Sequence, residues 1–191
     1  MKQIIVAMTG ATGALYTLRL LDRLLAQEQV CVHFIASPWA QRVVQEETGT
    51  ELDCHLSRYD RARFIRYDHS DLASSLSSGS FCIDAMVIIP CTMGTLGAIA
   101  SGLSSNLIER ASAVTMKERR PLILVARETP LNTIALQQML NLSQAGAMIL
   151  PPMPAFYGHP TSVEDLVDTT VDRVLDELYL GDENTKRWGS V

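Results

Sequence analysis

The sequence has no closely spaced cysteine pairs and no long hydrophobic runs, and each absence excludes a class of protein. No apolar stretch approaches the roughly 20 residues that a membrane-spanning helix needs. The four cysteines, Cys31, Cys54, Cys82 and Cys91, lie far apart. We therefore expect four free thiols and no metal site, because a structural zinc site needs four ligands in closely spaced pairs. The formal net charge of −5 argues against a general nucleic-acid-binding surface.

The amino-terminal residues carry no sign of a secretory signal. Residues 1–3 lead directly into an apolar segment, without a separate charged region and cleavage site. We therefore expect a cytoplasmic protein that binds no membrane. The 191 residues, of which 47% are hydrophobic, suffice for one α/β domain spanning residues 1–191. A chain this apolar is also expected to bury surface between the subunits of a homo-oligomer.

The first strand, turn and helix organise the rest of the chain. Five apolar residues, Ile4 to Met8, predict a strand buried on both faces, and the leucines between residues 15 and 25 recur at helical spacing. Gly10 and Gly13 lie in the turn between them. Glycine lets the backbone approach a ligand closely, and the free N–H groups at a helix start favour a phosphate. We expect a phosphate or nucleotide cradle here, with a plain connecting turn as the alternative.

This turn does not match the dinucleotide-binding fingerprint. That fingerprint has a third glycine and an acidic residue about 20 residues further on, at the end of the second strand. Here the second apolar run, Val30 to Ile35, ends in Ala36-Ser37-Pro38, and no carboxylate follows. The sequence therefore disfavours a nicotinamide dinucleotide.

Strand and helix patterns alternate along the remaining chain. Strands are expected at 85–89, 122–126 and 148–150, and helices at 38–47, in the small-residue segment before Gly102, at 107–118, at 133–144 and from Ser162 onwards. Ser37 is expected to cap the helix that begins at Pro38, and Asn106 the helix that begins at Leu107. Residues 50–80 are expected to form an ordered excursion, with 64–67 at a sheet edge. Alternation predicts a mainly parallel sheet with helices on both faces, a three-layer Rossmann-like α/β fold.

In such a sheet, ligands bind outside the carboxyl ends of the strands. Four of these ends are expected to form one crevice: Gly10 to Gly13, Ser37, Cys91 to Thr95, and Arg127 with Glu128. Their glycines, hydroxyls and single arginine suit a phosphorylated planar cofactor, although composition does not say which one.

Several longer motifs carry a family resemblance. They are Met8-Thr9-Gly10-Ala11-Thr12-Gly13-Ala14, Cys91-Thr92-Met93-Gly94-Thr95, Asn106-Leu107-Ile108-Glu109-Arg110-Ala111, Lys117-Glu118-Arg119-Arg120-Pro121-Leu122, Arg127-Glu128-Thr129-Pro130 and Pro154-Ala155-Phe156-Tyr157. In this order they strongly resemble the UbiX-type flavin prenyltransferases. The resemblance implies a homododecameric flavoprotein that joins the dimethylallyl group of dimethylallyl monophosphate to reduced FMN without a metal. The product, prenylated FMN, would serve a UbiD-type decarboxylase.

The resemblance also assigns roles to residues of this chain. It implies FMN contacts at Gly10, Ala11, Thr12, Ser37, Cys91, Thr92, Met93, Gly94 and Arg127. It implies prenyl-phosphate contacts at Ser78, Arg110, Lys117, Glu128, Tyr157 and Arg173. Catalytic roles fall on Thr12, Glu47, Lys117, Glu128 and Trp188, the last in a tail, residues 181–191, that closes over the active site. Thr12 stands where many members have serine, so its hydroxyl has more restricted rotamers.

Two other functions remain open. One is flavin-dependent decarboxylation of a cysteinyl carboxylate, as in a related flavoprotein group that uses an early histidine. The early histidine here, His33, lies inside the second predicted strand and faces away from the crevice. The other is a carrier that binds FMN without chemistry, in which case Lys117, Glu128 and Arg173 would have no purpose. Without the resemblance, these charges would be solvated surface residues.

Overall fold

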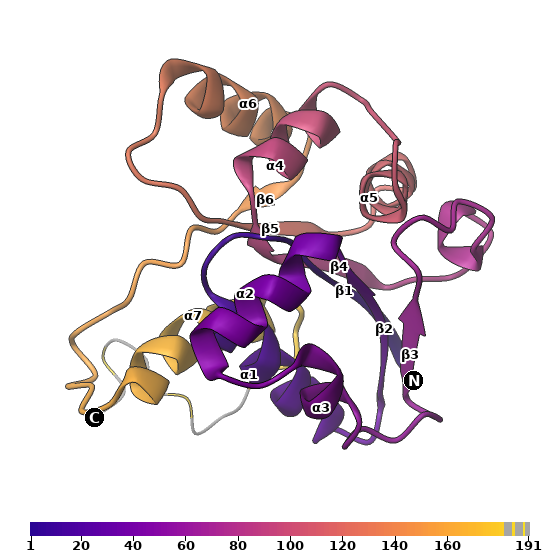
Figure 1. Cartoon of the computed structure of the whole chain (residues 1–191). Helices are drawn as coiled ribbons and strands as arrows, with labels where there is room; N and C mark the ends of the chain where they lie inside the picture. The colour runs from indigo at the N-terminus through magenta and orange to yellow at the C-terminus, as the bar shows by residue number, and fades with distance from the viewer. Residues whose placement is uncertain (182–184, 186–188, 190–191) are drawn as a thin grey trace.

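A six-stranded parallel sheet forms the centre of the protein (Figure 1). The structure is a computed structural model that describes residues 1–181, 185 and 189. The strands are β1 (Lys2–Met8), β2 (Val30–Ala36), β3 (Phe64–Tyr67), β4 (Ala85–Cys91), β5 (Leu122–Ala126) and β6 (Met148–Ile149). Their order across the sheet is β3-β2-β1-β4-β5-β6. The chain therefore runs outward from β1 to β3 and returns to β4 on the other side, which places the topological switch beside β1.

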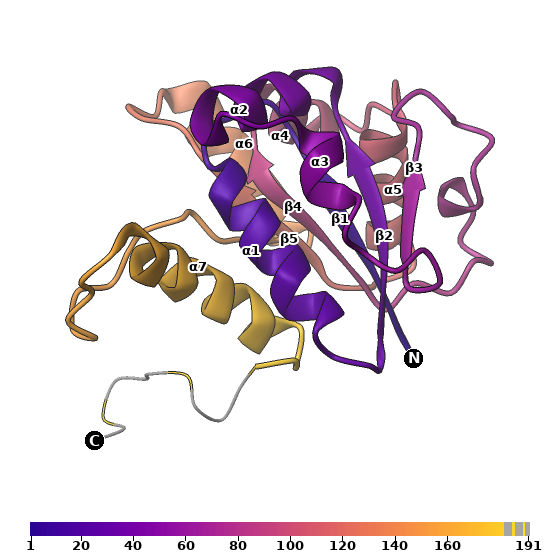
Figure 2. The same cartoon turned by 60° about the horizontal axis from the view of Figure 1, so that its bottom comes forward.

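Helices cover both faces of the sheet (Figures 1 and 2). One face is covered by α1 (Ala14–Leu25), α2 (Pro38–Thr48), α3 (Leu52–Leu56) and α7 (Val163–Glu177). The other is covered by α4 (Met93–Ala100), α5 (Leu107–Lys117) and α6 (Thr133–Gln144), with the short 3-10 helix η1 (Ser75–Ser77) beside α5. The expected three-layer Rossmann-like α/β fold is confirmed.

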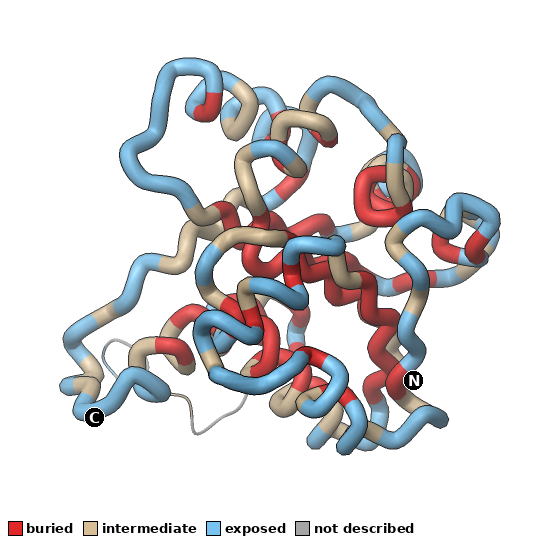
Figure 3. The backbone as a smooth tube through the Cα atoms, in the orientation of Figure 1, coloured by how far each residue is buried: buried red, intermediate tan, exposed pale blue. Residues whose placement is uncertain are grey.

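The two faces of β1 pack into separate cores, because successive side chains of a strand point to opposite sides. Ile4, Val6 and Met8 belong to the core beneath α1 and α7. Ile5 and Ala7 belong to the core beneath α4 and α5. The strands β1, β2, β4 and β5 form the continuous buried band in Figure 3. Strands buried on both faces explain the unbroken apolar runs in the sequence.

Local capping sets several helix ends. The Asn106 side chain accepts the N–H of Glu109 at 3.1 Å, which confirms the expected cap of α5. Ser162 and Asp165 form a reciprocal capping box at the start of α7. Gly49 ends α2 with a positive φ of 71°. Ser37 occupies the N-cap position of α2, as expected, but its hydroxyl makes no capping hydrogen bond.

No helix in the described part of the chain is long and apolar enough to cross a membrane. All four cysteines are free thiols, as expected, and Cys31 and Cys91 are buried.

Candidate active site

The carboxyl ends of four strands are tied together by hydrogen bonds. The N–H of Ser37 donates to the carbonyl of Met8 at 2.9 Å, which joins β2 to β1. The Thr9 hydroxyl accepts the N–H of Thr92 at 2.9 Å and donates to the Pro90 carbonyl at 2.7 Å. The N–H of Arg127 donates to the carbonyl of Cys91 at 3.1 Å. The four segments expected to form a crevice therefore do meet at one sheet edge.

The start of α1 is already occupied by a carboxylate of this chain. Glu47, near the end of α2, accepts the N–H of Gly13 at 2.8 Å and the N–H of Ala14 at 2.8 Å. It also accepts a hydrogen bond from the Thr12 hydroxyl. The expectation that these N–H groups are free for a phosphate is therefore wrong. A negative side chain at a helix N-terminus satisfies the donors and the helix dipole in the same way.

Gly10 is required by the protein's own packing. A Cβ atom at this position would lie 2.5 Å from the Cβ of Trp39, in the first turn of α2. Real Cβ atoms do not approach so closely, so any side chain at position 10 would displace α2. The sequence suggested close approach to a ligand as the reason for glycine at this position. Packing against Trp39 is a second reason. The Trp39 side chain is 73% exposed beside it.

Ser37 and the start of α4 remain available for a ligand. The Ser37 hydroxyl is buried and has no hydrogen-bond partner in the structure. At Gly94, a Cβ atom would meet only the Thr92 hydroxyl, at 4.0 Å, so this turn is open. Thr92 itself caps α4 by accepting the N–H of Thr95 at 3.2 Å. An unpaired buried hydroxyl after β2 and an open helix start after β4 each suit a phosphate or another polar ligand group.

Cys91 contributes only its backbone to this edge of the sheet. Its side chain is fully buried in the core beneath α4. Burial raises the pKa of the thiol to about 12, so the group stays neutral. Any contact between this residue and a cofactor must be made by its backbone.

A second group of expected site residues lies at the opposite edge of the sheet. Lys117 ends α5 before β5 begins, whereas Glu128 follows the end of β5. The five residues of β5 span about 16 Å. Within one chain, Lys117 and Glu128 therefore do not contact the same small molecule. The sequence contained this signal, because the expected strand separates the two residues.

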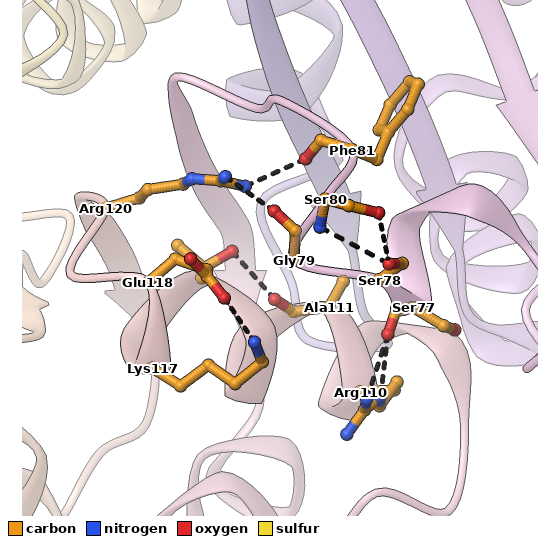
Figure 4. Close-up of polar contacts among 11 residues, drawn as sticks. Ser77, Ser78, Gly79, Ser80, Phe81, Arg110, Ala111, Lys117, Glu118 and Arg120 are labelled. Carbon is orange, nitrogen blue, oxygen red and sulfur yellow. Dashed lines mark hydrogen bonds and ion pairs between the residues drawn. The ribbon is translucent and has the colours of Figure 1, made fainter.

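Ser78 and Arg110 lie on the loop and the helix that lead to Lys117 (Figure 4). The Ser78 hydroxyl pairs with that of Ser80 at 2.8 Å. The Arg110 guanidinium donates two hydrogen bonds to the carbonyl of Ser77, at 3.1 and 3.0 Å. Arg110 therefore holds the serine-rich loop in addition to its expected role near the prenyl phosphate.

The remaining expected residues are spread over the end of the chain. Arg173 on α7 pairs with Glu177 at 3.2 Å. Glu177 lines, together with Lys117, a cavity of about 540 Å³ at the starts of β5 and β6. Tyr157 is 47% exposed in the segment that leads to α7, and the Glu128 carboxylate accepts the N–H of Thr129 at 3.0 Å. Trp188 lies outside the described residues, as does most of the tail expected to close over the site.

His33 is a buried structural residue. Its Nδ1 lies 2.9 Å from the Tyr67 hydroxyl, and its Nε2 lies 2.8 Å from Oε1 of Gln3. Burial lowers the pKa of His33 to about 4, so the ring is neutral near pH 7. The expectation that His33 lies inside the second strand is confirmed. Within residues 1–181, 185 and 189, no three His, Cys, Asp or Glu side chains are grouped to hold a metal ion.

The sequence profile of the Flavoprotein family matches residues 1–175. The chain is 48% identical to the flavin prenyltransferase UbiX of Pseudomonas aeruginosa, and the alignment covers 98% of this chain and 94% of that one. It is 42% identical to the flavin prenyltransferase LpdB of Lactiplantibacillus plantarum, with 98% of both chains covered. The chain belongs to the UbiX family of flavin prenyltransferases. The resemblance noted in the sequence is thereby confirmed.

Solved structures of UbiX proteins have the same fold. A dodecameric FMN-dependent UbiX-like decarboxylase from Escherichia coli O157:H7 superposes with a TM-score of 0.93 at 42% identity, covering 98% of this chain and 100% of that one. AnUbiX in complex with FMN and dimethylallyl pyrophosphate superposes with a TM-score of 0.92 at 43% identity, covering 100% and 98%. A PPC decarboxylase, at 19% identity and a TM-score of 0.66, covers 92% of this chain and 98% of its own and shares the fold alone.

Four residues near the site received no role from the sequence. Trp39 packs on Gly10. Gly79 and Glu118 lie against Lys117, and Arg120 donates to the Gly79 carbonyl (Figure 4). The motif from Lys117 to Leu122 contains two of them, Glu118 and Arg120, but the family resemblance assigns a role only to Lys117. Gly79 lay in a serine-rich stretch with no periodic pattern, so its contact with α5 had no signal in the sequence.

Proposed function

We propose that this protein transfers the dimethylallyl group of dimethylallyl monophosphate to reduced FMN, and we base this on its membership of the UbiX family over nearly its whole length. In the transfer, the bond between the allylic carbon and the phosphate oxygen breaks, and inorganic phosphate leaves. The allylic carbon bonds to the reduced isoalloxazine ring. Reduced FMN supplies the electron-rich ring atoms, and the protein supplies binding, orientation and protons.

The crevice at the carboxyl edge is the proposed FMN site. The unpartnered Ser37 hydroxyl and the open turn at Gly94 fit a polar group of the cofactor, and Arg127 at the end of β5 supplies a positive charge. Gly10, Ala11, Thr12, Cys91, Thr92 and Met93 complete the proposed contacts. Because Glu47 occupies the start of α1, the phosphate of FMN is expected nearer Ser37, since a carboxylate would repel it.

Glu47 and Thr12 are the proposed proton-handling pair at this edge. Their hydrogen bond is present in the structure. A carboxylate paired with a hydroxyl next to the glycine turn can pass a proton to or from the flavin. Glu128, at the end of β5, is the proposed proton source for the departing phosphate.

The residues expected to bind the prenyl phosphate reach the FMN site only if a second copy of the chain brings them there. Lys117 lies at the opposite edge from the FMN crevice, about 16 Å away along β5, and Arg110 and Ser78 lie on α5 and on the loop that packs against it. We therefore propose that a neighbouring subunit brings its Lys117 edge, together with the Arg173 region, to the crevice. A homododecamer, the state named for the Escherichia coli O157:H7 structure, is the proposed assembly. Tyr157 and the Trp188 tail are proposed to enclose the isoprenyl group, where an aromatic face stabilises developing cationic charge.

The remaining parts of the proposal concern the whole chain. Residues 1–191 form one domain, the protein works in the cytoplasm, and the prenylated FMN passes to a UbiD-type decarboxylase. Neither alternative function gains support from the site. His33 is buried between Gln3 and Tyr67, which leaves the cysteine-decarboxylase alternative without its histidine, and a pure FMN carrier leaves the Lys117 group without a role.

An anaerobic reaction tests the proposal. The protein is incubated with reduced FMN and dimethylallyl monophosphate, without added metal. We expect release of inorganic phosphate and a flavin heavier by one five-carbon unit in the mass spectrum. An unmodified flavin together with decarboxylation of a cysteinyl substrate would support the alternative enzyme. Transfer of unmodified FMN to another apoprotein would support the carrier.

A further inference from the structure

The loop of residues 77–81 crosses α5 and is clamped to it by two arginines (Figure 4). Arg110 donates to the carbonyl of Ser77 from Nε and Nη2 at 3.1 and 3.0 Å. Arg120, just beyond α5, donates to the carbonyls of Phe81 and Gly79 at 3.0 and 2.9 Å. Each guanidinium uses two donors in a planar arrangement, so the backbone of the loop has a defined position over the helix.

Gly79 lies directly on the heads of Lys117 and Glu118. A Cβ atom at Gly79 would lie 2.6 Å from Nζ of Lys117 and 2.7 Å from Cδ of Glu118. Glycine is therefore the residue that leaves room for both heads at this point. The atoms in the way are the ends of flexible side chains and not backbone, so a substitution here moves the two heads before it moves the loop.

Lys117 and Glu118 form an ion pair beneath Gly79. The hydrogen bond from Lys117 keeps the pKa of the Glu118 carboxyl below its usual range, so the carboxylate remains charged. The Lys117 side chain is 52% exposed. An ammonium group has three donors, so after one is given to Glu118, two remain for another anion. The pair also restricts a side chain that otherwise has large rotamer freedom.

We propose that Glu118 is a positioning residue that, together with Gly79, holds the Lys117 ammonium in place to receive the phosphate of the prenyl donor. This inference rests on the proposed function, in which Lys117 binds that phosphate. Glu118 does not touch the substrate. It reduces the conformational freedom that Lys117 would otherwise lose on binding, which is the general benefit of preorganisation.

A double-mutant cycle tests this role. The variants are Glu118→Gln, Lys117→Ala and the double variant, and the quantity measured is the Kd of dimethylallyl monophosphate for the FMN-loaded protein by calorimetry. We expect Glu118→Gln to raise this Kd about fivefold, the effect of losing one exposed ion pair. In the Lys117→Ala background the same change is expected to have no further effect, because Glu118 acts through Lys117. Equal effects in both backgrounds would overturn the proposal.

Gly79→Ala provides a second, independent variant, since it displaces the same two heads and leaves both charges in place. It is expected to raise the Kd of dimethylallyl monophosphate, to leave the Kd of FMN unchanged, and again to have no effect in the Lys117→Ala background. Unchanged affinity for dimethylallyl monophosphate in Gly79→Ala would contradict the proposal. Asp53→Asn is the matched control, because it removes the carboxylate of another exposed ion pair, with Arg66 at 2.5 Å, and should alter neither Kd.

The outcome for the wild-type chain separates this inference from the proposed function. A wild-type chain that neither binds dimethylallyl monophosphate nor prenylates FMN would refute the proposed function. A wild-type chain that does both, but whose Glu118 and Lys117 substitutions act additively, would refute only the positioning role of Glu118.

Discussion

Glu47 accepts a 2.8 Å hydrogen bond from the backbone N–H of Ala14, the first residue of α1, across 33 residues of sequence. The same carboxylate also accepts the N–H of Gly13. The end of α2 thereby caps the start of α1, although α1 has no side-chain cap of its own at Gly13. One side chain therefore serves as a structural cap and as a member of the proposed proton-handling pair.

Replacing Glu47 should affect stability and catalysis separately. We expect Glu47→Ala to lower the free energy of unfolding of the FMN-free protein by about 1–2 kcal/mol, because two helix N–H groups lose their acceptor. Glu47→Gln retains an oxygen acceptor and should lose less. Urea denaturation measures this, and prenylation rates of the two folded variants measure the catalytic part. Glu46→Gln, in an exposed pair with Arg42, is the control, and an Ala variant as stable as the wild type would exclude the capping role.

Substitution of Gly10 should act through Trp39. Gly10→Ala places a Cβ atom 2.5 Å from that of Trp39, so we expect α2 to shift, the Ser37 hydroxyl to move and FMN binding to weaken at least tenfold. If packing against Trp39 is the only reason for glycine at position 10, adding the change Trp39→Gly should restore much of the affinity for FMN, because it removes the colliding Cβ atom. FMN fluorescence titration compares the three variants with the wild type. Failure of the double variant to recover would mean that Gly10 is needed for close approach to FMN itself.

The unpaired hydroxyl of Ser37 should matter for FMN and not for folding. Ser37→Ala removes no hydrogen bond that the structure contains, so the thermal midpoint should stay nearly unchanged. The Kd of FMN should rise about tenfold, as expected for one hydrogen bond to a charged group. Thr170→Val is the matched control, because the Thr170 hydroxyl is also buried without a partner but lies on α7, which packs against α1. If both variants bind FMN like the wild type, Ser37 does not contact the cofactor.

His33 should make stability depend on pH. Its pKa is about 4 in the folded protein, against 6.5 for an unperturbed histidine. Between these values the unfolded chain binds a proton at His33 that the folded chain does not, so stability falls as the pH decreases from 6.5 towards 4. The free energy of unfolding falls by about 3 kcal/mol over this whole pH range. His33→Gln should flatten this part of the curve in urea titrations, whereas the exposed His159→Gln should leave it unchanged; identical slopes in all three proteins would contradict the assignment.

The pattern-based part of the fold was predictable from the sequence because its causes are local. The run from Ile4 to Met8 is apolar throughout because β1 is buried on both faces. The cap at Asn106 and the glycine at 49 act within one helical turn, so their signals are short. The helix start at Ser37 was also located correctly, although the expected side-chain bond is missing.

Three features of the site depended on contacts between distant segments. Glu47 reaches Ala14 only because α2 packs against α1. Gly10 meets Trp39 where the ends of β1 and β2 lie side by side. Gly79 covers Lys117 because Arg110 and Arg120 hold an irregular loop on α5. No spacing rule in the sequence anticipates such pairs, since no regular element links the partners.

The sequence of this chain was thus enough to predict the strand–helix alternation, the motifs of the family and the edge of the sheet where ligands are expected to bind. Hydrophobic periodicity and the order of motifs are properties of the sequence itself. The separation of Lys117 and Glu128 by the strand between them was likewise readable from the sequence. Tertiary packing alone decided that Glu47 fills the start of α1 and that the Ser37 hydroxyl remains unpaired, because both facts depend on which side chains lie within reach of a donor or acceptor once the elements pack.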